Sequence, residues 1–403
     1  MQSDSSFVGQ KLTSVPAGTY NKVTVGVTSA VVTYCTTTSG IAGCNAGSVT
    51  QIVAGAAAPT TPSTFSLTLA SNQQAGLQLL FSFANAITVN ATTQAVTGVD
   101  LTAANVLTAV SLPPTLSSLG AGQLDYLEDV TGVVSRVSLG SSPPFISVQT
   151  STLGTITAVV TSSSIQSPNC VISTVVLSCT PPVVGQIASI DATLNADGSS
   201  SLLEYDPLSP TSVDVIEGVV STVPSSSTQF QIVTNELVLA TTNSLIGSNL
   251  NLGDPVQVTL QNVQPFAIDY KGLPIVPTPF SGGTSATDIL PGQTVALRVT
   301  GFTKASGTVP ALVNADFVVL RFTRVAGSVF SAPAPNFNIQ SLPPFFGQTG
   351  SNLVQFGTGN PNTYFDGYQN SSGMTVGDHI AVRVLYFGLT SVPSFDVAKV
   401  RKH

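Results

Sequence analysis

Four cysteines are the residues of this chain best suited to redox or metal chemistry, and they form two pairs of equal spacing. Eight residues separate Cys35 from Cys44, and eight separate Cys170 from Cys179. Zinc sites favour closer pairs, often with histidine, and dithiol redox sites use Cys-x-x-Cys. Each pair lies at the ends of strand-like segments, which favours two hairpin disulfides, Cys35–Cys44 and Cys170–Cys179; four free buried thiols are the alternative. Disulfides persist outside the cytosol, so this interpretation predicts an exported protein.

Catalysis by an imidazole would depend on His379, because the other histidine is the terminal residue. In the segment VGDHIAVRV, His379 alternates with Ala381 and Arg383, opposite an apolar face. A histidine on the polar side of a strand is usually solvated, and the Gly-x-Ser-x-Gly signature of a nucleophilic serine does not occur. The sequence therefore predicts no catalytic triad.

Carboxylates gather in LDYLED, with Asp125, Glu128 and Asp129, and in LEYD, with Glu204 and Asp206. A glycosidase needs two facing carboxylates about 5–9.5 Å apart, which spacing along a sequence does not establish, and the LDYLED spacing is not that of an EF-hand loop. No phosphate loop or dinucleotide fingerprint occurs. We interpret these acids as solvated residues on polar strand faces and predict a protein that is not an enzyme, with no cofactor and no metal.

The loop NTYFDGYQN holds the best candidates for contact with a ligand, Tyr364, Phe365 and Tyr368. Small β-barrels can bind sugars or bases by stacking them on exposed aromatic side chains. The chain has no tryptophan, and most of its aromatic residues are phenylalanines in core-like patterns. Packing of the turn is therefore the favoured role of this loop, and a sugar platform is the second.

Charge is scarce in this chain: Asp, Glu, Lys and Arg make up 8% of the residues, against about 25% in a typical soluble domain. No charged residue occurs between Lys22 and Asp100, and Lys and Arg gather towards the C-terminus. With a net charge of −7 and no basic patch, nucleic acid is excluded as a partner. No run of about 18 apolar residues is present to span a membrane. So neutral a surface permits self-association.

Most of the chain that would position these cysteines, acids and aromatic residues has the sequence pattern of β-strands. Val and Thr alternate over 22–34, as in a half-buried strand, whereas helical periodicity is confined to 101–120. Further along, a pattern occurs three times: a glycine flanked by β-branched residues, a Phe-containing strand, and a strand after a turn glycine. The turn glycines are Gly185, Gly292 and Gly377, at which we expect a positive φ.

Repeats of this length predict tandem small barrels rather than a solenoid. We therefore expect an all-β chain with an N-terminal β-sandwich over 1–103, a linker over 104–126, and three small β-barrels over 127–210, 211–324 (with an insertion) and 325–403.

Two parts of the sequence resemble bacterial families of unknown function. VPAGTYNKVTVGVTSAVVTYC, followed by TLASNQQAGLQLLFSF, is similar to domain of unknown function 4382. The three repeats resemble domain of unknown function 5666, a small barrel of the OB (oligonucleotide/oligosaccharide-binding) type that is found in tandem. This resemblance implies that the three barrels are OB-like. In the first family a signal or lipoprotein segment and at least one strand precede the Pro-Ala-Gly-Thr-Tyr turn, formed here by residues 16–20. The resemblance implies an exported protein and a first domain that lacks its start.

These observations together predict a non-enzymatic structural or interaction protein that is extracellular or at the outer cell surface. A sheet edge left open, with no charge nearby, is a template for a strand from another chain. We therefore expect the protein to associate with itself, forming a filament by β-strand exchange, or with other cell-surface components. A polysaccharide- or ligand-binding module is the alternative, and a hydrolase is the third possibility.

Overall fold

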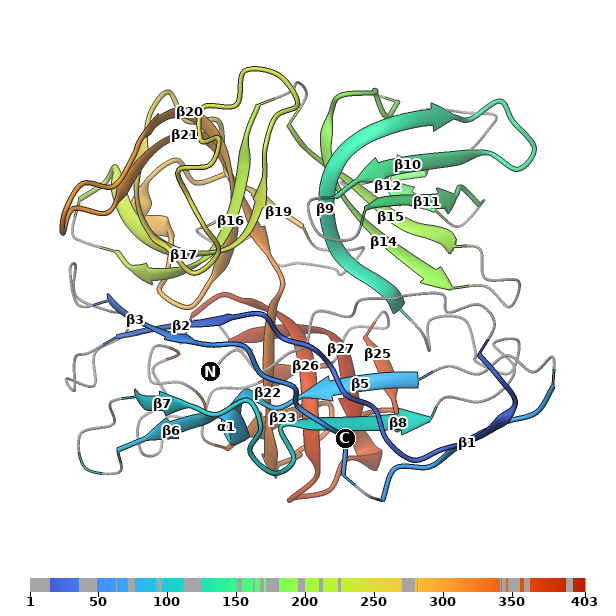
Figure 1. Cartoon of the computed structure of the whole chain (residues 1–403). Coiled ribbons are helices and arrows are strands. Elements are labelled where there is room, and N and C mark those ends of the chain that lie inside the picture. The colour runs from blue at the N-terminus through green and yellow to red at the C-terminus, as the bar shows by residue number, and fades with distance from the viewer. Residues whose placement is uncertain are drawn as a thin grey trace.

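Strands make up nearly all of the regular structure in the computed structural model of this chain (Figure 1). The helical elements that it describes are α1 (Phe83–Ala86) and two short 3-10 turns (Ala286–Asp288 and Ser371–Gly373). The predicted all-β class is confirmed. The structure describes residues 15–35, 49–62, 64–71, 77–90, 92, 96–111, 125–150, 154–161, 164–166, 170–171, 181–194, 200–209, 213–223, 226–269, 280, 282–340, 342, 346, 356–358, 363–388 and 394–402.

The N-terminal part forms four two-stranded antiparallel sheets. Their strands are β1 (Gly18–Tyr20) with β4 (Leu67–Leu69), β2 (Ala30–Cys35) with β3 (Val49–Ala54), β5 (Leu77–Phe81) with β8 (Leu107–Ser111), and β6 (Ile87–Val89) with β7 (Val96–Val99). A small apolar core of Ala86, Leu101 and Val106 packs between them. Strand β8 lies within the residues predicted as a linker, and its pairing with β5 joins it to this N-terminal part.

Three barrels follow, which we number 1 to 3 in chain order. Barrel 1 contains β9 (Asp125–Ser138), β10 (Phe145–Gln149), β11 (Thr155–Val159), β12 (Ile165–Gln166), β13 (Cys170–Val171), β14 (Ile187–Leu194) and β15 (Ser200–Ser209). Barrel 2 contains β16 (Val215–Thr222), β17 (Gln229–Val238), β18 (Pro255–Leu260), β19 (Ala267–Ile268), β20 (Thr294–Thr303) and β21 (Ala311–Arg321). Barrel 3 contains β22 (Thr323–Ser331), β23 (Asn336–Ile339), β24 (Phe356–Gly357), β25 (Tyr364–Asp366), β26 (His379–Tyr386) and β27 (Phe395–Lys402).

The three barrels share one strand order. In barrel 1 the order β11–β10–β9–β14–β15 is closed by parallel pairing of β11 with β15. Barrel 2 repeats it as β18–β17–β16–β20–β21, and barrel 3 as β24–β23–β22–β26–β27, each with the same parallel closure. This closed five-strand arrangement confirms the small barrels that the repeats predict, and it is of the OB type.

A glycine in each first strand lets that strand bend around its barrel, as the curl of β9 shows (Figure 1). A Cβ atom added to Gly132 in β9 would lie 2.5 Å from the carbonyl oxygen of Gln149. One added to Gly218 in β16 would lie 2.6 Å from the carbonyl oxygen of Val233, and Gly327 in β22 is similarly crowded. Only glycine permits this approach, so the first strand can pair with the second strand on one edge and the fourth on the other.

Replacing Gly132 by alanine is therefore expected to lower the free energy of unfolding by about 1–3 kcal/mol, the usual cost of overpacking. Urea unfolding followed by circular dichroism measures the loss. Gly98→Ala in β7 is the matched control, because a Cβ atom there meets nothing within 4 Å. Equal losses in the two variants would contradict the close approach of β9 to β10.

The turn glycines before the fourth strands have the left-handed conformation that the repeats predict. Their φ is 90° at Gly185, 90° at Gly292 and 92° at Gly377. Each donates its N–H to a carbonyl oxygen of the first strand, at 2.8 Å in every barrel. The prediction of a positive φ is confirmed, and the same turn fixes the fourth strand beside the first in all three repeats.

Each barrel buries its own apolar core. In barrel 3, Phe337, Phe356 and Phe395 stack in a row, with neighbouring ring centroids 5.0 and 4.5 Å apart. In barrel 1, the buried Tyr205 donates its hydroxyl to the side-chain oxygen of Gln186 at 2.6 Å. The barrels are thus separate cores, and their outer faces remain for contact with one another.

Candidate functional site

The barrels pack together through the outer faces of their strands. Barrels 1 and 2 share an apolar seam whose buried members are Val133, Ile187, Leu208, Val215, Val238, Ala296 and Val319. Barrel 3 joins barrel 2 through Leu385, which is fully buried in the barrel 2 core cluster. The side-chain amide of Gln293 in barrel 2 also donates to the carbonyl oxygen of Tyr386 at 2.9 Å. The outer faces therefore form a junction between barrels.

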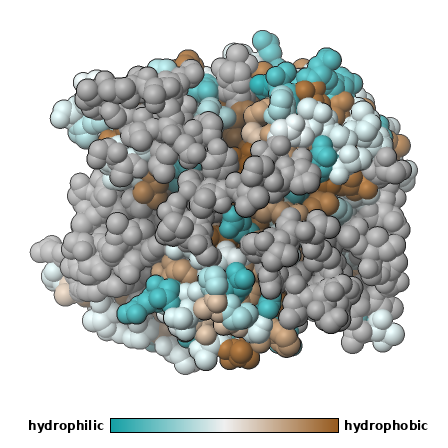
Figure 2. Space-filling view, turned by 180° about the vertical axis from the view of Figure 1, so that it is seen from behind, coloured by the Kyte–Doolittle hydropathy of each residue, from teal (hydrophilic) through white to brown (hydrophobic). Residues whose placement is uncertain are grey.

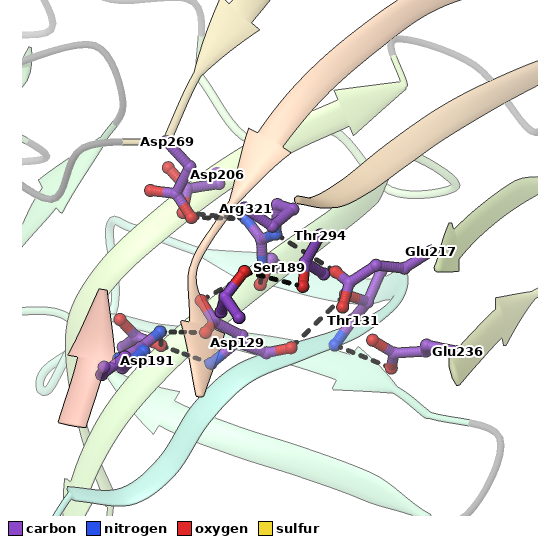
Figure 3. A network of polar contacts seen from close by, with 12 residues as sticks. Asp129, Thr131, Ser189, Asp191, Asp206, Glu217, Glu236, Asp269, Thr294 and Arg321 are labelled. Carbon is purple, nitrogen blue, oxygen red and sulfur yellow. Dashed lines mark hydrogen bonds and ion pairs between the residues drawn. The ribbon is translucent and has the colours of Figure 1, made fainter. Parts of the chain in front are cut away.

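Arg321, the last residue of β21, lies in the middle of this junction and is only 1% exposed (Figure 3). Within barrel 2 its guanidinium contacts Asp269 at 2.6 Å and Glu217 at 3.3 Å. From barrel 1, Asp129 lies 3.2 Å and Asp206 3.7 Å from guanidinium nitrogens. Burial opposes the charge, but these four carboxylates hold the pKa of Arg321 above its ordinary value. The side chain is a buried cation shared by two barrels.

Asp129 links all three barrels. Its φ of 53° is left-handed, which aspartate tolerates better than most residues, and it lies where the register of β9 with β14 shifts. Its N–H donates to a carboxylate oxygen of Asp191 at 2.6 Å. Its carboxylate pairs with Arg321 and with Arg383 of barrel 3, whose guanidinium lies 3.7 Å from Asp191. An irregularity in one strand thus directs one carboxylate towards cations from both other barrels.

Two glutamates lie side by side at the seam between barrels 1 and 2 (Figure 3). Glu217 on β16 is the register partner of Glu236 on β17. Glu236 accepts a hydrogen bond from the N–H of Thr131 in β9, at 3.3 Å, and Thr131 is only 2% exposed. Barrel 2 therefore presents a pair of carboxylates to the first strand of barrel 1.

The scarce charge of this chain is concentrated at the junction. Its acids are Asp129, Asp191, Glu204, Asp206, Glu217, Glu236 and Asp269. Barrel 1 contributes most of these acids, and barrel 3 contributes the cation Arg383. Two C-terminal arginines, Arg321 and Arg383, therefore complement the acids of barrel 1.

Three of these acids have an arrangement that a metal ion could use. Glu204, Asp206 and Asp269 each offer an oxygen within 4.8 Å of the others. The guanidinium of Arg321 already reaches Asp206 and Asp269, so the chain brings its own cation to these carboxylates. We therefore assign the cluster to the ion network of the junction.

The sequence interpretation of the acids as solvated is wrong for three of them. Glu204 is 5% exposed, Asp206 is 4% exposed, and the side chain of Asp129 is 13% exposed. The reason is that a neighbouring barrel covers the outer strand face on which they lie. Asp125 and Glu128 belong to β9, but their side chains lie outside the described residues.

His379 is exposed at the start of β26, where its Nδ1 lies 3.1 Å from the hydroxyl of Ser328. The solvated position predicted for it is confirmed. Ala381 and Arg383, which share its side of the strand, are 7% and 6% exposed. Only the first residue of this face meets solvent, and the rest enters the junction.

Two of the three predicted ligand-contact residues have packing roles. Phe365 and Tyr368 are half-buried and pack against the core of barrel 3. The Tyr368 hydroxyl donates to Asp378 at 2.7 Å, and the ammonium of Lys402 lies 5.0 Å from its ring centroid. Tyr364 begins β25, but its side chain lies outside the described residues.

The cysteine predictions fall outside the described part of the chain. Cys35 is the last residue of β2, and Cys170 is the first residue of β13. The side chains of both, and the whole of Cys44 and Cys179, lie outside the described residues. The two disulfides stay predictions.

Sequence reasoning assigned no role to the two arginines of the junction, Arg321 and Arg383, or to four of its acids, Asp191, Glu217, Glu236 and Asp269. For the arginines there was a signal, because each interrupts an apolar strand, in FVVLRF and in HIAVRV. In a chain so poor in charge, an arginine among buried-type residues indicates a buried ion pair. The sequence does not identify the acid with which Arg383 pairs, because that acid, Asp129, lies two barrels away along the chain.

Similarity to known proteins is slight. No family model matches the chain, and no curated protein matches it. Among solved structures, the chain is similar to one described as "drosophila Unr CSD456", with 7% identity, 70% of this chain and 99% of that chain covered, and a TM-score of 0.17. A TM-score that low carries no argument about the protein. Because no family model matches, the two family resemblances stay predictions. None of the helices that the structure describes is long and apolar enough to cross a membrane.

Proposed function

We propose that this chain is an exported structural or interaction protein of the cell surface that associates with other copies of itself. The observation that carries the proposal is the placement of charge. Seven acids lie at the barrel junction with Arg321 and Arg383, whereas the N-terminal sheets carry no charge between Lys22 and Asp100. Export rests on the paired cysteines and on the family resemblances, and it stays part of the proposal.

The junction supports a structural role because it holds three barrels in one arrangement. Buried ion pairs contribute little net stability, but they penalise arrangements in which a charge loses its partner. Asp129 needs both Arg321 and Arg383 beside it, which is possible only when all three barrels meet. A fixed body of this kind suits a building block.

The sheet formed by β2 and β3 supplies the surface for self-association. Among the described strands, β2 and β3 pair only with each other. The hydroxyl of Thr33 and the side-chain amide of Gln51 both donate to the carbonyl oxygen of Gly253 at 2.6 Å, which holds the hairpin against barrel 2. A hairpin with an open edge and no charged side chain is a template for a strand from a second copy.

Backbone pairing fits this molecule better than docking of apolar side chains. On the face shown in Figure 2, the described residues form a mosaic of small hydrophilic and hydrophobic areas. Exposed valines occur at most in pairs, Val31 with its register partner Val53 and Val183 with Val184, so they form no large apolar patch. Added strands gain affinity from main-chain hydrogen bonds and do not need a large apolar patch.

Replacing Val53 by lysine is expected to abolish self-association, because a lysine on an edge strand opposes the addition of another strand. Val53 is 67% exposed in β3, so the fold tolerates the change. Val376→Lys is the matched control, since Val376 is 69% exposed in the turn before β26. Light scattering and electron microscopy of both variants and of the unmodified chain measure the effect.

The proposal expects polymers from the unmodified chain and from Val376→Lys, and monomers from Val53→Lys. A monodisperse monomer of the unmodified chain at high concentration would exclude self-assembly. Polymers in all three samples would support self-assembly but exclude the β2–β3 edge as the site of contact.

A further inference from the structure

We propose that Glu217 and Glu236 share a single proton at neutral pH and that its loss in alkali loosens the seam between barrels 1 and 2. This device is independent of self-assembly and of the cell-surface role. It would make the packing of barrel 1 on barrel 2 sensitive to pH through one pair of side chains.

The geometry places two like charges directly opposite each other. Glu217 and Glu236 are register partners on antiparallel β16 and β17. Side chains so placed have Cβ atoms about 4.5–5.5 Å apart, and two like charges at that distance destabilise a sheet. Two carboxylates this close avoid the repulsion by keeping one proton between them.

The cations near the pair do not balance it. Arg321 contacts Glu217 at 3.3 Å but also serves Asp129, Asp206 and Asp269. Arg324 at the start of β22 is the second cation whose charge acts on Glu217. Beyond these, the remaining charged residues described in the junction are the acids Asp191 and Glu204 and the cation Arg383. Asp191 and Arg383 pair with Asp129 or with each other, and Glu204 lies beside Asp206 and Asp269. The pair therefore lies in a region where acids outnumber bases.

Both carboxyls resist ionisation for the same physical reason. Burial raises the pKa of Glu217, and the charge of Asp129 adds to the effect while Arg321 opposes it. Burial, followed by the charge of Glu217, raises the pKa of Glu236 to about 8, against the hydrogen bond from Thr131. Because the two groups interact, the apparent pKa values belong to the pair.

The sign of the pH effect follows from linkage. An acid whose pKa is higher in the folded chain than in the unfolded chain binds its proton more tightly when folded. Its stabilising contribution is complete below the ordinary glutamate pKa and is lost as the pH rises through about 8. The contribution of the pair to the stability of the seam should thus be complete in acidic solution, fall through neutral pH and be lost in alkali.

Nuclear magnetic resonance of the full chain, labelled with ¹³C at the glutamate carboxyls, tests the shared proton directly. The chain contains four glutamates, Glu128, Glu204, Glu217 and Glu236, so the spectrum has few signals to assign. We expect the Glu236 signal to titrate near neutral or alkaline pH, with a matching inflection in that of Glu217. If both signals complete their titration in the range of ordinary carboxyls, the proposal is wrong.

Thermal unfolding at a series of pH values tests the effect on the seam. Glu236→Gln keeps the shape of the protonated side chain, so its midpoint should equal that of the unmodified chain at about pH 5 and exceed it by several degrees at about pH 9. Asp254→Asn, a carboxylate of barrel 2 outside the seam, is the control and should follow the unmodified chain at both values. Parallel curves for Glu236→Gln and the unmodified chain would overturn the proposal.

Discussion

Replacing Arg321 by methionine is expected to lower the free energy of unfolding by about 3–5 kcal/mol, the usual cost of removing one partner from a buried ion pair. Methionine fills much of the space but leaves the carboxylates of Asp129, Asp206, Glu217 and Asp269 without the cation that they share. Their mutual repulsion then acts inside the junction, where water screens it least.

Arg298→Met is the matched control for this variant, because Arg298 is also in barrel 2 and also pairs with an aspartate, Asp316. Its contacts with Asp316, at 2.7 and 3.0 Å, lie near the surface, where such pairs contribute about 0–1 kcal/mol. Urea unfolding of both variants measures the two losses. Similar small losses would show that the junction is open to water and that Arg321 does not hold it.

Replacing Asp214 by alanine is expected to cost at least about 3 kcal/mol, since each buried donor left without an acceptor costs about 1–3 kcal/mol. The carboxylate of Asp214 is buried and accepts the N–H groups of Ala240, Leu245 and Ile246 at 2.7, 2.7 and 2.9 Å. It also accepts the hydroxyl of Ser244 at 3.0 Å. Alanine removes the acceptor for all of these groups at once, so the loop after β17 loses its anchor.

Urea unfolding also measures this loss, and two further variants define it. Asp214→Asn keeps one acceptor oxygen and should fall between alanine and the unmodified chain. Asp254→Ala removes a more exposed carboxylate that accepts the N–H of Asn251 at 2.8 Å, and it should cost far less. If Asp214→Ala and Asp254→Ala lose the same stability, the hydrogen bonds of Asp214 are not what holds the loop.

The barrels could be predicted from the sequence because their requirements are local. A first strand that curls needs a glycine such as Gly132, and the turn before a fourth strand needs a positive φ such as that of Gly185. These needs recur at matching places in every repeat, so they produce a visible pattern. The alternation of apolar residues then sets which side of each strand enters the core.

The junction could not be predicted, because it depends on contacts between repeats. The rule that the second face of a barrel strand meets water predicted a solvated Glu204 and Asp206, but a neighbouring barrel covers that face. The left-handed φ of Asp129 leaves no mark in the sequence either, since it arises from a register shift between β9 and β14. Partners such as Asp129 and Arg383 belong to different repeats, and no local pattern connects them.

The contact between Asp129 and Arg383 also has a consequence for the order in which the protein is made. Chains emerge from the ribosome N-terminal end first, and domains generally fold as they appear. Barrel 1 is therefore complete while its acids still face water, and Arg321 reaches them when barrel 2 is finished. Arg383 arrives only with β26, after barrel 2 is finished. A chain that stops before β26 should keep barrels 1 and 2 folded, but barrel 3 stays open and the junction stays unfinished. Cellular proteases can distinguish such a chain from the completed molecule.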